Sequence, residues 1–162
     1  MSSFEIRRAV DGDRAWIDAL MVELWCGPTQ VANGREYRPA ELPGFVAVEE
    51  GSIIGYAPFE VVGDTCWVAL LRSLSEGRGI GSALVRAITE EGRALGCVRI
   101  AVITTNDNVR AARLYEHLGF QVAEVRPGAV AASRAIKPSI PLFGENGTPM
   151  TDEIEYELRL DV

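Results

Sequence analysis

Three glycines lie within five positions of the stretch "EGRGIGSALVRA", residues 76–87, directly before a helical pattern. Each glycine costs about 0.5–1 kcal/mol relative to alanine in ordered structure, so the cluster indicates a backbone that must turn tightly or be approached closely. The first N–H groups of a helix lack intrahelical partners, and the helix dipole adds partial positive charge there. Gly77, Gly79 and Gly81 therefore predict a site for a phosphate-like anion, with a plain tight turn as the alternative.

Two common nucleotide-binding motifs do not describe this turn. The Walker A pattern GxxxxGK[ST] is absent from the chain. The dinucleotide pattern GxGxxG also fails, because the third residue after Gly79 is Ser82 and the third after Gly81 is Leu84. The strand before the turn comes late in the chain and follows a predicted hairpin, unlike the first unit of a dinucleotide-binding fold. A phosphate bound here must be bound in another kind of fold.

Composition and charge narrow the class of protein. The chain has 162 residues, of which 48% are hydrophobic and 24% charged, as in a soluble globular protein, and we expect one domain over residues 1–162. The formal net charge of −7 argues against a nucleic-acid partner and is compatible with a cationic substrate such as an amine. The chain lacks a long apolar run and a signal-peptide core, so we expect a cytoplasmic protein without a membrane partner.

The cysteines and the single histidine carry no clear chemistry. Cys26, Cys66 and Cys97 fit neither a zinc spacing nor a CxxC pair, so we expect small, buried or half-buried apolar residues and no metal site. His117 lies in the variable part of its segment, and we interpret it as an outward-facing residue rather than a base.

The elements that must position the glycine turn follow from hydrophobic periodicity. The expected strands are residues 3–9, a hairpin over 45–62, and residues 65–71, 97–104, 120–126 and 153–160. The expected helices are residues 13–25, capped by Asp11, residues 80–95, and residues 106–119, ended by Gly119. Residues 26–44 predict a loop with a short helical piece, and residues 127–152 an irregular segment. This order predicts an α/β protein with a mixed sheet and helices on both faces.

A second motif, "NVRAARLYEHLGF" at residues 108–120, gives the glycine turn a context. Together the two blocks closely resemble the GNAT superfamily of acyl-CoA-dependent N-acyltransferases. The family's first signature, [Q/R]-x-x-G-x-[G/A], reads here as Glu76-Gly-Arg-Gly79-Ile-Gly81. Its second, N-x-x-A-x-x-x-Y-x-x-x-G-F, is matched at Asn108, Ala111, Tyr115, Gly119 and Phe120. Glu76 departs from the pattern, because the family usually has Gln or Arg there.

The resemblance covers nearly the whole chain and implies a fold and a cosubstrate. The implied fold is a mixed, mostly antiparallel sheet that is splayed in the middle, with helices on both faces. The implied cosubstrate is acetyl-CoA, with its pyrophosphate on the backbone amides around Arg78, Gly79, Gly81 and Ser82. The Arg78 side chain is expected to add a positive charge nearby. The pantetheine arm is expected between the strands at 65–71 and 97–104.

The family transfers an acyl group from a thioester directly to an amine. An oxyanion forms and needs N–H donors, for which the resemblance implies a backbone amide near Leu70 to Arg72, with Leu71 against the cofactor. The departing thiolate needs a proton, and Tyr115 stands at the family's general-acid position, where it also meets the cofactor. Asn108 is implied to contact the pantetheine arm, and it also fits a helix N-cap.

The amine must also lose a proton. An amine like that of lysine has a pKa near 10.4, so its neutral form costs roughly 4.6 kcal/mol at pH 7. Some family members use a glutamate in the strand before the glycine turn, but residues 64–73 contain none. Glu23, Glu60, Asp64 and a water chain are the alternatives for the base.

The acceptor site is expected from residues 25–41 and 134–150, which are too irregular for core and too long for simple turns. Polar anchors are expected at Arg35, Tyr37, Arg134 and Lys137. Four apolar residues of the second segment are expected to dock on the body, namely Ile136, Ile140, Leu142 and Phe143.

The leading hypothesis is acetyl transfer to a small-molecule amine or an amino acid, whose carboxylate Arg134 and Lys137 would suit. A protein N-terminus or lysine is an alternative acceptor, and a non-catalytic acyl-CoA sensor is an alternative function. A homodimer is left open.

Overall fold

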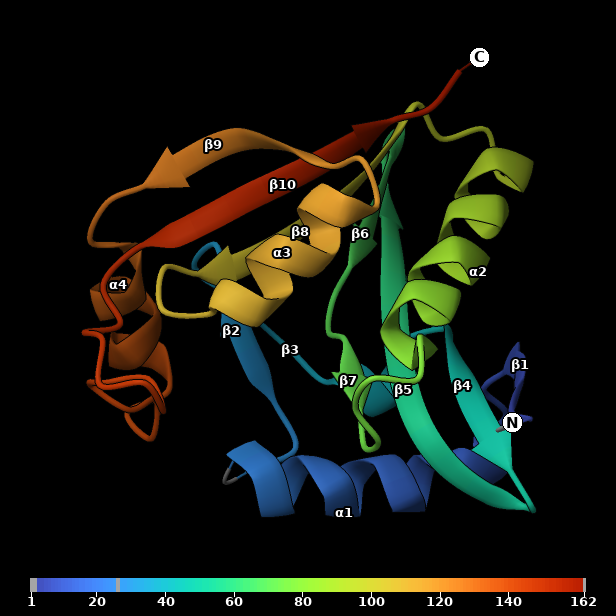
Figure 1. The fold of residues 1–162 in the computed structure, drawn as a ribbon. Helices are drawn as coiled ribbons and strands as arrows, with labels where there is room; N and C mark the ends of the chain where they lie inside the picture. The colour runs from blue at the N-terminus through green and yellow to red at the C-terminus, as the bar shows by residue number, and fades with distance from the viewer. Residues whose placement is uncertain (1–2, 26, 162) are drawn as a thin grey trace.

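The computed structural model describes residues 3–25 and 27–161 (Figure 1). The strands are β1 (Glu5–Arg8), β2 (Gln30–Ala32), β3 (Arg35–Tyr37), β4 (Gly44–Glu49), β5 (Ser52–Val62), β6 (Thr65–Val68), β7 (Arg72–Ser73), β8 (Arg99–Thr105), β9 (Gln121–Arg126) and β10 (Glu153–Arg159). The α-helices are α1 (Arg14–Trp25), α2 (Ile80–Ala94), α3 (Val109–His117) and α4 (Ala129–Ile136). Short 3-10 turns lie at Asp11–Asp13 and Pro39–Glu41. Within the described ranges, no helix is long and apolar enough to cross a membrane.

The sheet confirms the predicted fold class. Its strands follow the order β1-β4-β5-β6-β8-β10-β9, and the short β7 also pairs with β5. The pairings among these strands are antiparallel except for that of β6 with β8, which is parallel. Parallel neighbours need a long crossover, and here β7 and α2 provide it. The glycine turn therefore sits at the start of the crossover helix.

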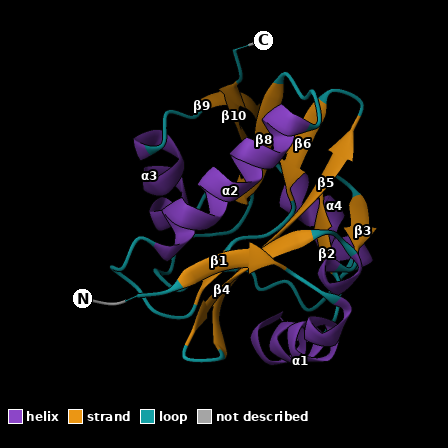
Figure 2. Cartoon of the chain, turned by 90° about the vertical axis from the view of Figure 1, so that its right-hand side faces the viewer, coloured by secondary structure: helices purple, strands orange, loops and turns teal. Residues whose placement is uncertain are grey.

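Helices cover both faces of the sheet, as expected. Ala57 of β5 belongs to the apolar cluster under α2, whereas its neighbour Tyr56 packs with Ile17 and Met21 of α1. Successive side chains of a strand point to opposite faces, so α1 and α2 lie on opposite sides of β5. Figure 2 shows α1 and α2 on different sides of β1 and β4.

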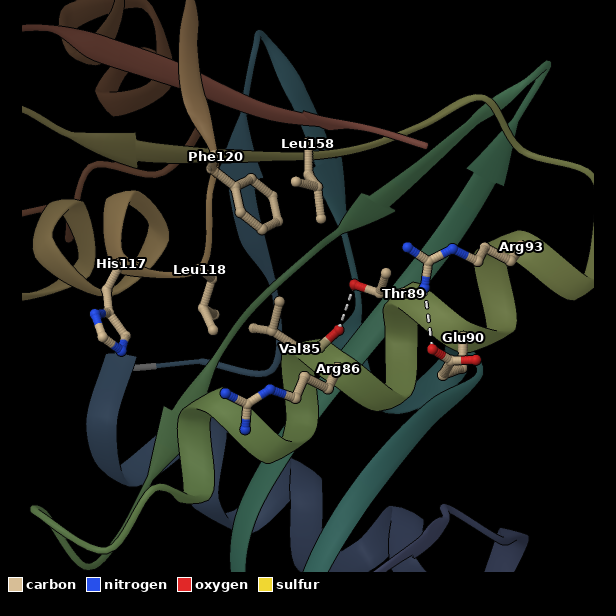
Figure 3. Close-up of a pocket in the computed structure, with 9 residues that line it drawn as sticks. All are labelled: Val85, Arg86, Thr89, Glu90, Arg93, His117, Leu118, Phe120 and Leu158. Atoms are coloured by element: carbon tan, nitrogen blue, oxygen red, sulfur yellow. Dashed lines mark hydrogen bonds and ion pairs between the residues drawn. The ribbon is translucent and has the colours of Figure 1, made fainter. Parts of the chain in front are cut away.

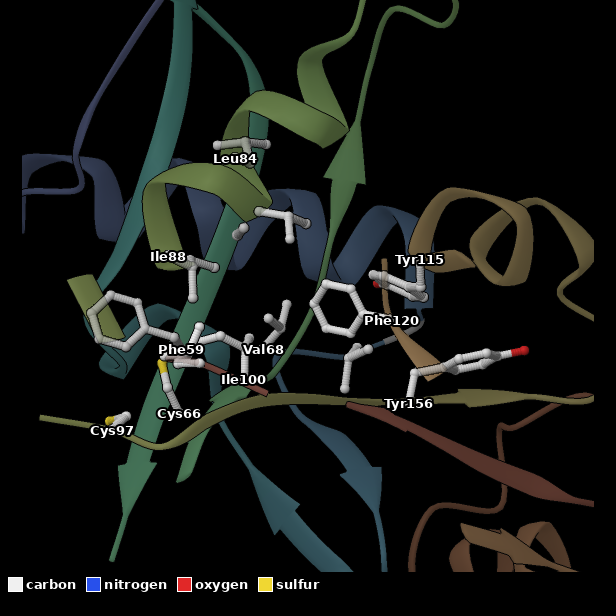
Figure 4. Packing of buried hydrophobic residues seen from close by; sticks show 14 of the residues in the cluster. Phe59, Cys66, Val68, Leu84, Ile88, Cys97, Ile100, Tyr115, Phe120 and Tyr156 are labelled. Carbon is white, nitrogen blue, oxygen red and sulfur yellow. The ribbon is translucent and has the colours of Figure 1, made fainter. Parts of the chain in front are cut away.

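The larger core lies between α2, α3 and the central strands (Figure 4). Leu84 and Ile88 of α2 are fully buried against the sheet there. Cys66 and Cys97 are free, buried thiols of the same cluster, which confirms the expectation for them, and burial raises the pKa of Cys66 to about 12. Cys26 lies outside the described residues.

The first helix forms as predicted, but Asp11 does not cap it. A 3-10 turn at Asp11–Asp13 precedes the helix, and Asp11 is exposed. The Asp13 carboxylate makes the hydrogen bonds at this turn. It accepts the Val10 N–H at 2.8 Å and two hydrogen bonds from the Arg7 guanidinium. The sequence offered two aspartates, and tertiary pairing with Arg7 selected the second.

The segments at 26–44 and 127–152 contain more regular structure than predicted, and the short helical piece expected in the first is the 3-10 turn at Pro39–Glu41. Residues 30–37 form the β2–β3 hairpin, which turns at Asn33 with a φ of 52°. Residues 129–136 form α4. Three-residue strands and an eight-residue helix are too short to show a clear periodicity, so tertiary contacts decide their structure.

The predicted docking of the apolar residues in the second segment is wrong for three of the four. Ile136, Leu142 and Phe143 are 43%, 63% and 58% exposed. The segment is held by polar bonds instead, since the Arg134 guanidinium donates to the carbonyl oxygens of Ile140 (3.1 Å) and Pro141 (2.8 Å).

Candidate active site

Strands β6 and β8 run side by side over only part of their length. Their parallel ladder begins at Thr65 and Arg99 and ends at Val68 and Val102, whereas β8 continues to Thr105. Beyond this ladder the chain enters β7, which pairs with β5 (Figure 1). The sheet therefore splits between β6 and β8, as the resemblance implies.

A bulge lies at the mouth of this split. Strand β6 pairs with β5 up to Val68, and β7 resumes the pairing at Arg72. Between them the Ala69 N–H donates to the Pro58 carbonyl at 3.0 Å. The register then shifts, so residues 70–71 face a single residue of β5. A bulge of this kind ends regular pairing and redirects the strand, which leaves these two residues at the split.

The glycine turn, at the start of α2, lies against the same bulge. Gly77 and Gly79 have φ of 74° and 76°, a left-handed conformation that favours glycine. Gly81 serves a different need, because a Cβ there would lie 3.3 Å from Leu114 of α3 and 3.7 Å from Leu71 of the bulge. The glycines therefore allow the turn and bring α2 against both neighbours.

The first turn of α2 presents free amides. Its first intrahelical bond runs from the Ala83 N–H to the Gly79 carbonyl at 3.0 Å. The N–H groups of residues 80–82 precede that bond and have no intrahelical acceptor. Gly81 and Ser82 are half-buried at this position. The geometry is that of an anion site at a helix N-terminus.

The Arg78 side chain is directed elsewhere than expected. Its guanidinium hydrogen-bonds to the Glu49 carboxylate, with 3.1 Å from Nη1 to Oε1, and it lies 5.8 Å from the ring centre of Phe4. The bond to Glu49 raises the pKa of Arg78 and lowers that of Glu49. The positive charge expected beside the phosphates is therefore balanced by the Glu49 carboxylate. The backbone amides at the start of α2 remain as the groups that could bind an anion.

Tyr115 of α3 lies beside the split, on the side of β8 and β10. Its side chain is 3% exposed, and its ring centre is 5.5 Å from that of Phe120 and 5.9 Å from that of Tyr156 (Figure 4). Tyr156 is the register partner of Val102, where the β6–β8 ladder ends. Burial raises the pKa of the Tyr115 phenol, so the hydroxyl keeps its proton at neutral pH. The phenol can therefore donate a hydrogen bond, although its raised pKa makes it a weaker acid than an ordinary tyrosine.

Two contacts fix the start of α3. The Asn108 side chain accepts the Ala111 N–H at 3.1 Å, so Asn108 is the helix N-cap, one of its two expected roles. Glu76 of the glycine turn forms an ion pair with Arg110 in the first turn of α3. The residue that departs from the family pattern thus links the two motif segments.

The β2–β3 hairpin bridges the split on the opposite face. Arg35 pairs with Glu60 of β5, and the Tyr37 hydroxyl donates to the Ala69 carbonyl, both on one side of the split. On the other side, the Asn33 N–H donates to the Glu153 carboxylate of β10 at 3.1 Å. The hairpin is therefore bonded to both halves of the sheet.

The candidate bases differ in position. Glu60 is the register partner of Trp67, one residue from the end of the ladder, and it lies under the hairpin. Asp64 is exposed in the turn before β6, at the strand end remote from the split. Glu23 is exposed on α1. Of the three carboxylates, the geometry brings only Glu60 near the split.

The cations expected at the acceptor site bind backbone carbonyls. Arg134 donates to the segment that follows it, and Lys137 Nζ donates to the Thr29 carbonyl at 2.5 Å. Arg134 and Lys137 therefore no longer support an acceptor that carries a carboxylate. The Lys137 bond instead ties the α4 end to the start of the hairpin.

Sequence reasoning missed Asn106, which fastens the segment before β10. Its Oδ1 accepts the N–H groups of Thr151 and Asp152, each at 3.0 Å, and its Nδ2 donates to the Pro149 carbonyl at 2.9 Å. These bonds span 43 to 46 residues, so the run Asn-Asp-Asn at 106–108, which indicates only local turns and caps, did not reveal them.

A cavity of about 340 Å³ opens between α2 and α3, away from the split (Figure 3). Its lining comes from α2, the end of α3, the residue before β9 and strand β10. The lining residues are Val85, Arg86, Thr89, Glu90, Arg93, His117, Leu118, Phe120 and Leu158. His117 is exposed at its edge, which agrees with its outward interpretation. Within residues 3–25 and 27–161, no group of three His, Cys, Asp or Glu side chains could hold a metal ion.

The fold has counterparts among solved acetyltransferases. An IAA acetyltransferase from Bacillus cereus ATCC 14579 superposes with a TM-score of 0.72 at 21% identity, over 98% of this chain and 100% of that one. YncA from Salmonella typhimurium, a putative acetyltransferase solved with acetyl-CoA, gives 0.72 at 21% identity, over 99% and 96%. At this identity the likeness concerns the fold.

Sequence comparison defines the family. The model of the acetyltransferase (GNAT) family matches residues 7–120, and the chain belongs to that family. The Bacillus subtilis (strain 168) protein YdhI is 41% identical over 138 residues, which are 85% of this chain and 86% of that protein. The resemblance seen in the two motifs is thereby confirmed.

Proposed function

We propose that residues 1–162 form a single N-acetyltransferase domain that moves an acetyl group from acetyl-CoA to the primary amine of a small molecule. The observation that carries the proposal is the convergence of the glycine turn, the bulge and Tyr115 at the end of the β6–β8 ladder. Free amides can bind the pyrophosphate, strand backbone can bind the pantetheine arm, and a phenol can donate a proton to the departing thiolate.

Acetyl-CoA binds by its phosphates at the start of α2. The amides of Gly79, Gly81 and Ser82 hold the pyrophosphate, and that of Arg78 adds to them. Backbone groups suit this role because they stay in place while the Arg78 charge is paired with Glu49. The solved structure of YncA with acetyl-CoA supports this cosubstrate.

The pantetheine arm enters the split between β6 and β8. There it pairs with the strand backbone as an added strand would. Leu71 lies at the bulge and Asn108 at the head of α3, and both contact the arm. The thioester then lies between the bulge and Tyr115.

Acyl transfer proceeds in two steps at the thioester. The amine lone pair forms a bond to the carbonyl carbon, and the π electrons move to the oxygen, which a backbone amide of the bulge stabilises. The oxyanion then re-forms the carbonyl, the carbon–sulfur bond breaks, and its electrons leave with sulfur. Tyr115 donates its proton to that thiolate. The amine proton passes to a base and the products are an amide and CoA.

The base is Glu60 or a water held near it. Glu60 is the candidate carboxylate beside the split, and its partner Arg35 is largely exposed. An incoming ammonium group can replace Arg35 in the ion pair, which brings the amine to a carboxylate before its proton leaves. This arrangement favours a cationic amine over an acceptor that must be recognised by its carboxylate.

Turnover of acetyl-CoA tests the proposal. The wild-type protein is assayed for free CoA with diamines, amino acids and peptides that carry a free N-terminus or lysine. We expect turnover with a diamine to exceed that with amino acids and peptides. Turnover with peptides alone would make the acceptor a protein. CoA binding by calorimetry without turnover on any amine would support the sensor alternative and contradict catalysis.

A further inference from the structure

The Ala69 carbonyl has an unusual partner. Residues of an antiparallel hydrogen-bonded pair exchange two bonds, one from each N–H. The Ala69 N–H donates to the Pro58 carbonyl, but Pro58 has no N–H to return the bond. The Ala69 carbonyl instead accepts from the Tyr37 hydroxyl, which reaches it from β3. Tyr37 thus takes the place of a strand N–H.

This bond fixes the peptide group that enters the bulge. The Ala69 carbonyl and the Leu70 N–H belong to one planar trans peptide and point in opposite directions. The Ala69 N–H faces β5, and in an extended residue the carbonyl faces the same neighbour. The Leu70 N–H therefore faces away from β5, toward the gap that opens between β6 and β8 beyond Val68.

We propose that Tyr37 is a positioning residue for acyl transfer, which holds the Ala69 carbonyl so that the Leu70 N–H donates to the thioester oxygen. The inference rests on the proposed function, because it needs a thioester in the split. Tyr37 itself contacts neither substrate nor cofactor. The hairpin that covers the acceptor side thereby also sets the oxyanion donor, and a displaced hairpin leaves the active site without it.

The surroundings of Tyr37 keep its hydroxyl protonated, so that it can donate a hydrogen bond to the Ala69 carbonyl. Burial is the main reason that the pKa of its phenol is raised, and the Glu153 carboxylate raises it further. Arg35 lowers it by less than Glu153 raises it, and Glu60 adds a smaller increase. The hydroxyl therefore keeps its proton over the pH range of an assay. The neighbouring bonds of Arg35 and Asn33 hold β3 in register over the bulge.

The chain offers a matched control. Tyr56 is a second tyrosine with a raised pKa, fully buried where Tyr37 is half-buried, and its hydroxyl donates to the Pro39 carbonyl at 2.6 Å rather than to a carbonyl of the bulge. Tyr37→Phe and Tyr56→Phe each remove one hydroxyl that bonds to a backbone carbonyl. A purely structural role predicts the same outcome for both variants.

The test compares both variants with wild type in steady-state turnover. We expect Tyr37→Phe to lower kcat by about ten- to a hundredfold, since a lost oxyanion donor costs 10²- to 10³-fold and a misplaced one somewhat less. The Kd for CoA and the KM for the amine should stay within about twofold, because ground-state binding does not use the Leu70 N–H. Tyr56→Phe should keep kcat and lower only the thermal stability.

A second variant and a spectroscopic signal make the test specific. Pro58→Ala restores the missing N–H, so Tyr37→Phe/Pro58→Ala should recover kcat relative to Tyr37→Phe alone. The 13C carbonyl signal of bound [1-13C]acetyl-CoA should move toward its free position in Tyr37→Phe and back in the double variant.

A wild-type kcat in Tyr37→Phe, equal losses in both tyrosine variants, or an unchanged carbonyl signal would overturn the inference. These results leave the proposed function intact, because the turnover of the wild-type protein with the panel of amines tests that function separately.

Discussion

The Glu76 carboxylate of the glycine turn accepts a hydrogen bond from the Arg110 guanidinium at the start of α3. Both side chains are largely exposed, so the pair contributes little to stability. The hydrogen bond and the charge of Arg110 lower the pKa of Glu76, which is therefore ionised at neutral pH. The turn thus carries a negative charge next to its proposed phosphate site, with a cation that partly offsets it.

Removal of that charge should tighten CoA binding. We expect Glu76→Gln to lower the Kd for CoA by about two- to fivefold at low salt, in the range of exposed charge interactions. The gain should shrink at high ionic strength, because salt screens exposed charges. Calorimetry at two salt concentrations measures both effects, with Glu90→Gln near the end of α2 as a control that leaves the Kd unchanged. A higher Kd for CoA in Glu76→Gln would mean that the ion pair of Glu76 with Arg110 supports CoA binding more than the Glu76 charge repels the phosphates.

Substitution of Gly79 should weaken CoA binding through charge and backbone strain together. Gly79→Asp places a carboxylate among the amides of the turn, and like charges at a contact cost several kcal/mol, so we expect at least about a tenfold loss of affinity. Gly63 is the matched control, because it has a φ of 61° and open space for a Cβ but lies in the β5–β6 turn. Equal affinities for CoA in Gly79→Asp and Gly63→Asp would disprove the phosphate assignment.

Gly81→Val should also reduce CoA binding, but it tests the site less cleanly. The new side chain would press on Leu114 of α3, so part of its effect comes from the α2–α3 contact. Thermal melting of this variant separates the two contributions.

Tyr115→Phe should lower kcat by about 10²-fold, the usual size of a general-acid effect, and leave the Kd for CoA unchanged. The pKa of Tyr115 is raised, so wild-type kcat should show no decline from its ionisation up to the ordinary tyrosine pKa of about 10. Tyr156→Phe is the control, since its ring packs against Tyr115 and we expect it to retain kcat. Equal kcat values in the two variants would reduce Tyr115 to a packing residue, provided that the absence of a thiol-release burst shows chemistry to be rate-limiting.

The central part of the fold could be predicted because its signals are local. The helix after the glycine turn, the N-cap at Asn108 and the hairpin at 45–62 each follow from spacing, capping or turn residues. The turn at Glu50 and Gly51 has positive φ at both positions, as a two-residue hairpin turn requires. The predicted fold class was correct for the same reason.

The acceptor side could not be predicted because its contacts join distant residues. Tyr37 donates to the Ala69 carbonyl, to which Pro58 has no N–H to donate, and no pattern within one segment reveals that bond. Arg78 was expected beside phosphates, but Glu49 from the preceding hairpin pairs with it. Charged side chains carry no periodicity, so their partners emerge from the tertiary structure.

Shortening of the segment at residues 134–147 should act on the acceptor. Replacement by a Gly-Ser turn removes the Lys137 bond to the Thr29 carbonyl, which ties this segment to the start of the hairpin. We expect a higher KM for the amine and an unchanged Kd for CoA. Leu142→Ser/Phe143→Ser is the control, because both side chains are exposed and should leave the kinetics unchanged. Unaltered acceptor kinetics in the shortened protein would assign the segment a structural role.

Stability should fall in acid through Glu155 of β10. Its carboxylate is 6% exposed and accepts hydrogen bonds from Arg99 (2.9 Å) and Arg126 (2.5 Å). Burial by itself raises the pKa of Glu155, but the bonds from the two arginines outweigh it, so the pKa lies below its ordinary value near 4.5. The folded state therefore holds the ionised form more tightly than the unfolded state. This stabilisation is complete above about pH 4.5 and is lost as the pH falls through the folded pKa.

Urea unfolding of wild type and Glu155→Gln between pH 7 and pH 3 tests this linkage. We expect Glu155→Gln to lower the free energy of unfolding by about 1.5–3 kcal/mol at pH 7, since it weakens hydrogen bonds between charged groups, while Arg99 keeps Glu157 and Arg126 keeps Glu124 as partners. The difference should shrink below pH 4.5, because the wild-type carboxylate then becomes protonated as well. Glu90→Gln is the control, as its pair with Arg93 is exposed and should change stability little at any pH. If the wild-type and Glu155→Gln values stayed parallel down to pH 3, the two arginines would not hold the Glu155 charge.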